Sequence, residues 1–176
     1  YSVSPKGVDE VQALLMVGLV FTVGFTGYLM LDSQQEIEQL ELEQDPHWPI
    51  LDVCLDSHSE VVEHYHITLS INIDGSDVEI PAETGIQDEF CPDGMRGIHT
   101  HDSTGKLHIE TPDQENGTIG AFFAIWNQTF NQNQILDNQA NSDFEIIMDV
   151  NGQQNNEYQH YLMRDGDQIE IRYQAK

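Results

Sequence analysis

Five of the eight histidines lie in two short stretches, HYH at residues 64–66 and IHTHDSTGKLHIE at residues 98–110. Imidazole is largely neutral near pH 7, and its nitrogen lone pair binds borderline metals such as Cu²⁺ and Zn²⁺. Two histidines at alternate positions of a strand, or opposite each other on paired strands, can reach the same ion. The two stretches therefore predict a metal site with these ligands: His64, His66, His99, His101 and His108.

Both stretches read as strands that present their histidines on one face. In residues 64–73 apolar and polar side chains alternate, which puts both histidines of that strand on its polar face. In the second stretch a turn at residues 102–105 pairs His99 with His108 and leaves His101 on the same face. We expect the two strands to be neighbours, so that the five rings converge on an open face opposite the apolar core.

Two acidic residues extend this candidate site. Glu110 shares the strand face of His108 and is a further ligand or an outer partner. Asp102 is placed to orient His101, because metal-bound imidazoles usually donate their second nitrogen to a carboxylate or carbonyl. One ion takes three or four ligands, so five imidazoles indicate either two ions or a bridging arrangement. Copper(II) binds nitrogen sites more tightly than other first-row divalent metals, which favours copper, with zinc as the alternative.

A long apolar segment precedes these stretches. Between Glu10 and Asp32 there are 21 consecutive uncharged residues, which as a helix span about 32 Å, the thickness of a bilayer core. An acidic stretch follows, and the prolines of DPHWP end the helical pattern. We therefore expect two domains: residues 1–45 as a membrane-length or assembly helix with an acidic extension, and residues 46–176 as a histidine-rich head.

Short strands separated by turn dipeptides dominate the head. Further strands are expected at FEIIMDV, residues 144–150, and QIEIRY, residues 168–173, with turns at Asp-Gly and Asn-Gly pairs. GTIGAFFAIWNQTF, residues 117–130, reads as an amphipathic helix with its aromatic residues on one face. We therefore predict an α+β class, with a long N-terminal hydrophobic α-helix and a head that packs one helix against a mixed sheet.

The charge balance restricts partners and location. With 31 acidic and 6 basic residues the net charge is -25, which excludes nucleic acid as a partner and favours cations. Lys6 precedes the apolar segment and acidic residues follow it, so the head is expected outside the cell. Cys54 and Cys91 then favour a disulfide, with free thiols or thiolate metal ligands as alternatives. Asn116 and Asn127 begin glycosylation acceptor patterns.

The histidine motifs belong to a wider pattern of sequence. Residues 62–173, with HYH, IPAETGI, HTHDSTGKLHIE, GTIGAFFAIWN and YLMRDGDQIEIRY, resemble a widespread, poorly characterised exported family of archaea and bacteria. Ile119 and Asn127 depart from the family's pattern around its helix start. The closing segments are similar to β-grasp domains, so the resemblance implies a β-grasp-like head. It supplies no established activity.

The N-terminal stretch KGVDEVQALLMVGLVF, residues 6–21, resembles the processed N-terminus of archaeal type IV pilins, although a pilin normally starts nearer to its apolar run. This resemblance implies a homopolymer packed through the N-terminal helices. We expect a non-enzymatic structural subunit of an extracellular filament that displays a copper-binding head. The alternatives are a single-pass protein, anchored in the cell membrane, that binds or delivers copper, and a small copper oxidoreductase.

Overall fold

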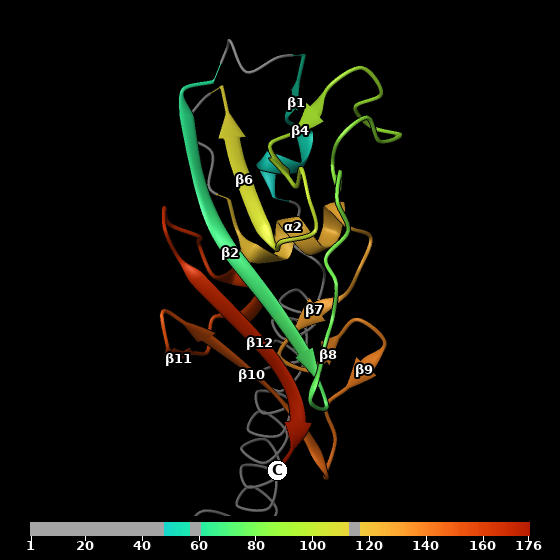
Figure 1. Ribbon diagram of the computed structural model, residues 1–176, viewed down its shortest axis with the longest axis vertical. Helices are drawn as coiled ribbons and strands as arrows, with labels where there is room; N and C mark the ends of the chain where they lie inside the picture. Colours follow the sequence, from blue (N-terminus) through green and yellow to red (C-terminus); the bar gives the residue numbers. More distant parts are fainter. Residues whose placement is uncertain (1–47, 57–60, 113–116) are drawn as a thin grey trace, which may run out of the picture. The chain divides into compact units, whose positions relative to one another are not determined.

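The computed structural model describes residues 48–56, 61–112 and 117–176 (Figure 1). The chain divides into two compact units, Tyr1–Pro46 and His47–Lys176, and this boundary lies one residue from the predicted one. The helices and strands of the described residues all belong to the second unit. In chain order they are η1 (Pro49–Asp52), β1 (Cys54–Leu55), β2 (Glu63–Ile73), β3 (Ser76–Asp77), β4 (Met95–Arg96), β5 (Ile98–His99), β6 (Lys106–Thr111), α2 (Ile119–Ile125), β7 (Phe130–Asn131), β8 (Gln134–Ile135), β9 (Asn138–Gln139), β10 (Phe144–Val150), β11 (Gln153–Asn155), η3 (Tyr158–His160) and β12 (Gln168–Ala175).

The largest sheet has its strands in the order β11-β10-β12-β2-β6-β5, and β3 pairs with β2 off this path. β2 and β12 run parallel, while the other neighbours run antiparallel. β6 pairs with the first half of β2, from Glu63 to Thr68, and β12 pairs with the second half, from Thr68 to Ile73. Figure 1 shows this stagger, with β6 beside the start of β2 and β12 beside its end. The histidine stretches therefore fall in one half of the sheet.

The central strand β2 forms where the sequence alternates. Ile67, Leu69 and Ile71 are buried, and the polar residues between them are exposed, as the period of two predicts. The strand ends at Asp74 and Gly75, whose φ angles are 49° and 83°. Two consecutive left-handed residues make the turn that suits a tight hairpin, and Asp-Gly is a preferred pair for it. This part of the sequence prediction is confirmed.

The buried face of the sheet packs against α2, which crosses behind the strands in Figure 1. Phe122 and Phe123 of the helix are fully buried in the same cluster as Ile67 and Ile109. The Thr118 hydroxyl caps the start of the helix by accepting a hydrogen bond from the backbone N–H of Ala121 at 3.3 Å. The core therefore lies on one face of the histidine-bearing strands.

The predicted α+β class with a β-grasp-like head is wrong, because the described residues form three sheets and one α-helix of seven residues, which is a mostly β structure. The helix predicted over residues 117–130 ends at Ile125. Asn127 has a φ of 57°, a left-handed conformation that cannot continue a right-handed helix. The chain then forms the β7-β8-β9 sheet, whose strands of two residues are too short for alternation to reveal them.

The predicted N-terminal hydrophobic helix lies in residues 1–47, outside the described residues. Within residues 48–56, 61–112 and 117–176, no helix has the length and hydropathy that a membrane crossing requires. The membrane and assembly expectations for the N-terminal segment therefore stay predictions.

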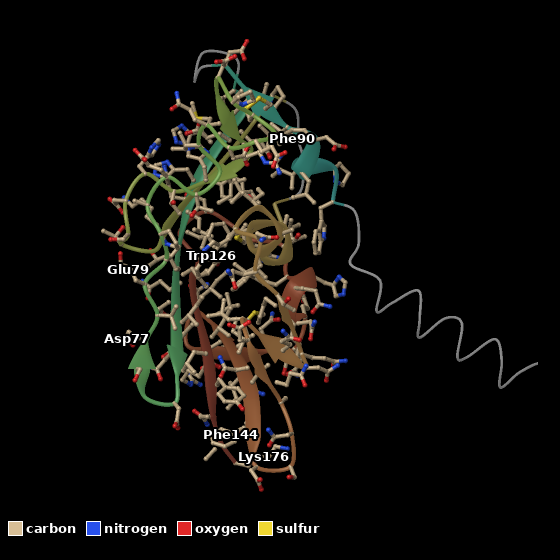
Figure 2. The ribbon with its side chains drawn as sticks, turned by 90° about the vertical axis from the view of Figure 1, so that its right-hand side faces the viewer. Asp77, Glu79, Phe90, Trp126, Phe144 and Lys176 are labelled. Carbon is tan, nitrogen blue, oxygen red and sulfur yellow. A yellow bond between two sulfur atoms is a disulfide. The ribbon has the colours of Figure 1, made fainter. Side chains whose placement is uncertain are left out.

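The predicted disulfide is confirmed: Cys54 and Cys91 are bonded, with their Cα atoms 5.6 Å apart. Beside it, β1 pairs antiparallel with β4, and β4 leads directly into β5. Figure 2 shows Phe90, the neighbour of Cys91, at the opposite end of the head from Phe144 and Lys176. The disulfide and the β1-β4 sheet together hold β4, which leads into the second histidine stretch.

Candidate metal centre

Three neighbouring strands place the histidines. β6 lies between β2 and β5, and its His108 is directly opposite His66 on one side and His99 on the other. The predicted pairing of His99 with His108 is therefore confirmed, and so is the neighbourhood of the two histidine stretches. Residues opposite each other on adjacent strands point to the same face. One row of three imidazoles thus crosses the sheet.

The first group of ligand atoms comes from His64, His66 and His108. His66 Nε2 lies 3.0 Å from His64 Nε2 and 3.0 Å from His108 Nδ1. Glu110, opposite His64 in the ladder, places Oε1 3.1 Å from His64 Nε2 and 3.9 Å from His108 Nδ1. Two nitrogens bound to one ion lie about 3.3 Å apart in tetrahedral geometry and about 2.9 Å apart in square-planar geometry. The three nitrogens are therefore at the spacing of ligands around one ion, and the Glu110 carboxylate lies beside His64 at their edge.

Hydrogen bonding alone accounts poorly for this arrangement. A neutral imidazole nitrogen holds either one proton or one in-plane lone pair, so it makes one good hydrogen bond. His66 Nε2 nevertheless has two ring nitrogens at 3.0 Å, and His64 Nε2 has a ring nitrogen and a carboxylate oxygen within 3.1 Å. A cation among these atoms would accept all of their lone pairs at once, which favours a metal site.

The second group comes from His99, His101 and again His108. The His99 ring stacks on the His108 ring with centroids 5.4 Å apart, and His101 meets both rings edge-on at 4.9 Å and 4.6 Å. His99 Nδ1 lies 3.0 Å from the carbonyl oxygen of Arg96. Because a carbonyl only accepts, Nδ1 carries the proton and Nε2 carries the lone pair. A hydrogen bond from the second ring nitrogen to a carbonyl oxygen commonly orients a metal-bound imidazole.

Arg96 is the part of this site that sequence reasoning missed. Its guanidinium lies 4.0 Å above the ring of Phe90, pairs with Asp88 at 3.2 Å and donates to the carbonyl of Leu51 at 3.1 Å. These three contacts hold the backbone whose carbonyl orients His99. The only signal in the sequence is a rare basic residue, three positions before a candidate ligand in a strongly acidic chain.

The expectation that the histidines lie on an open face is wrong in part. His99 and Glu110 are fully buried, at 0% exposure. The His108 side chain is 17% exposed, while that of His64 is 48% exposed and His101 is also exposed. Alternation in the sequence separates the two faces of a strand but does not reveal what covers the second face. The cluster is a half-buried site with one exposed ligand in each group.

Burial keeps the central rings neutral. Desolvation, followed by the neighbouring His66, His101 and His99, lowers the pKa of His108 to about 4. Desolvation, followed by His64 and Lys106, also lowers the pKa of His66. A neutral imidazole has the lone pair that a metal needs, so the lowered pKa of each ring favours the form that binds metal.

The remaining predicted residues lie around the cluster or beyond the described part of the chain. Asp102 Oδ1 accepts hydrogen bonds from the backbone N–H and the hydroxyl of Thr104, which closes the hairpin turn and lowers the pKa of that carboxyl. Asn127 is exposed, as a glycosylation acceptor must be, while Asn116 lies outside the described residues. His160 lies exposed in η3 and belongs to neither group of ligand atoms.

Comparison with protein-family models, with curated proteins and with solved structures finds no match to this chain. The resemblances to an exported family and to archaeal pilins therefore stay expectations. Any function assigned to the chain depends on the geometry of the histidine cluster.

Proposed function

We propose that this chain is a transition-metal-binding protein that holds copper on its histidine cluster, with zinc as the alternative. The observation that supports this proposal is His66 Nε2, which lies 3.0 Å from two other ring nitrogens. Three imidazoles and a buried carboxylate are a ligand set suited to either metal. Copper(II) ranks above zinc at such nitrogen-rich sites, which is the reason for naming it first.

The disulfide supports a location outside the cell, and the acidic charge supports the binding of cations. The disulfide between Cys54 and Cys91 is of a kind that persists in oxidising compartments. The net charge of -25 favours the approach of cations to the surface. The further expectation, a filament assembled through residues 1–45, depends on the sequence alone and is part of the proposal on that basis. Imaging of native material for long regular fibres tests it, and a monomer extracted by detergent would contradict it.

The alternatives are metal delivery by a membrane-anchored monomer and a small copper oxidoreductase, and metal delivery is the better supported of the two. His64 and His101 are exposed ligands, one in each group, and an exposed ligand is what a partner could reach during transfer. We expect no enzymatic activity from the cluster. Turnover by the metal-loaded protein above background, with common oxidants or hydrolysable substrates, would contradict that expectation.

The test of metal binding compares exposed histidines, because replacement of buried His99 would also disturb packing. We expect the double variant His64→Ala/His101→Ala of the full chain to lose copper affinity by more than about tenfold. The matched control, His160→Ala, also removes an exposed histidine and should leave affinity unchanged. Calorimetric titration with Cu²⁺ and elemental analysis after desalting measure the effect. Equal copper binding by both variants would refute the proposed function.

A further inference from the structure

His108 belongs to both groups of ligand atoms. The first group adds His64 and His66 from β2, and the second adds His99 from β5 and His101 from the turn that follows it. A residue common to two groups has two explanations. Either one ion selects among five rings, or two ions lie on opposite sides of the shared ring.

The strand geometry separates these explanations. β6 lies between β2 and β5, so His66 and His99 flank His108 from opposite sides. Adjacent strands are about 4.8 Å apart, which puts the two flanking positions about 10 Å from each other. Two nitrogens on opposite sides of one ion are only about 4 Å apart. The ligand atoms accordingly form two groups, each with its members within 4.8 Å of one another, and not one group of all five histidines. This grouping favours two ions over one.

The His108 ring has two nitrogens that point away from each other. His108 Nδ1 lies 3.0 Å from His66 Nε2 and faces the first group. Nε2 lies on the other side of the same flat ring and diverges from Nδ1. An imidazole that binds through both nitrogens has lost its N–H proton, which passes to water when the second ion binds. The ring then joins two ions about 6 Å apart.

We propose that the cluster holds two metal ions that share His108 as a bridging ligand, with His64, His66 and Glu110 completing one side and His99 and His101 the other. This inference rests on the proposed metal-binding function. The two sides differ in charge, because the buried carboxylate of Glu110 lies 3.1 Å from His64 on the first side, whereas the second group of ligand atoms consists of imidazoles only. The carboxylate offsets part of the charge of a divalent ion, so the first side fills before the second.

The experiment uses the full chain and copper(II) alone as the probe. Elemental analysis after desalting should give two coppers per chain for the native protein and for His160→Ala. His64→Ala and His101→Ala each replace an exposed ligand on one side only, so each should retain one copper, half of the native amount. Two Cu²⁺ ions joined by one imidazole couple magnetically, so the native protein should give less electron paramagnetic resonance signal than its two coppers. Each single variant should give one full spin per copper.

The outcomes separate this inference from the proposed function. No copper retained by the native protein would refute both. One copper per native chain, with a normal spin signal, would refute the pair of ions and leave metal binding supported. Two coppers with two full, uncoupled spins would refute the shared ring. The bridge would be established if the native protein holds two coppers with a diminished spin signal and each single variant holds one copper with a full spin signal.

Discussion

The burial of His108 makes the metal-free protein sensitive to mild acid. Its pKa is lowered from 6.5 to about 4, first by burial and then by the neighbouring histidines. In the unfolded chain the ring binds a proton as pH falls through 6.5, while in the folded protein it stays neutral until about pH 4. The unfolded state therefore holds more protons over this window, so stability decreases as pH falls from 6.5 to 4 and levels off below it.

The size of the effect follows from the shift. Lowering the pKa of His108 from 6.5 to about 4 corresponds to a loss of about 3 kcal/mol of stability once pH is below both values. Between pH 7 and pH 5 the loss from His108 alone is about 2 kcal/mol. The lowered pKa of His66 also decreases stability as pH falls.

Urea unfolding of the metal-stripped protein at several pH values between 7 and 5 measures the slope. The variant His108→Gln lacks the titrating ring and should lose about 2 kcal/mol less over the same interval than the native protein. His160→Ala, which removes an exposed ring, should keep the native slope. Because slopes are compared, a lower absolute stability of His108→Gln does not affect the conclusion. Identical slopes for His108→Gln and the native protein would refute the argument that burial keeps this ring neutral.

Two further predictions concern the parts that hold the site in place. Reduction of the Cys54–Cys91 disulfide opens a loop with a sequence separation of 37 residues, and we expect it to lower the free energy of unfolding by about 4 kcal/mol. Urea unfolding with and without reductant measures this loss, and an unchanged unfolding midpoint would contradict the prediction. In Gly105→Ala the new Cβ would meet the carbonyl oxygen of Leu69, at a φ of 81°, so we expect a loss of more than about 2 kcal/mol. Gly75 has a similar φ but open space around it, so Gly75→Ala should lower the free energy of unfolding by only about 1 kcal/mol. Equal losses of stability in the two variants would refute the packing argument.

Sequence alone determined the strands and their register near the histidines. Alternation fixed which face of β2 is apolar, and the Asp-Gly turn fixed where it ends. The turn at residues 102–105 then sufficed to pair His99 with His108. These features are local, because each depends on residues only a few positions apart. The disulfide pairing was also predictable, because two cysteines have one possible intramolecular pairing.

Tertiary structure decided the fold class and the character of the site. The length of the helix was overestimated because Asn127, inside the predicted segment, has a left-handed backbone conformation, and periodicity does not report backbone conformation at one residue. The orientation of His99 by the Arg96 carbonyl depends on a segment that pairs with the distant residue Cys54. The burial of His99 and Glu110 likewise depends on contacts that alternation does not report. The same pairing puts His108 between two groups of ligands, because β6 lies between β2 and β5. Hydrophobic periodicity identifies one face of each strand, whereas the neighbours of a strand are set by contacts distant in sequence.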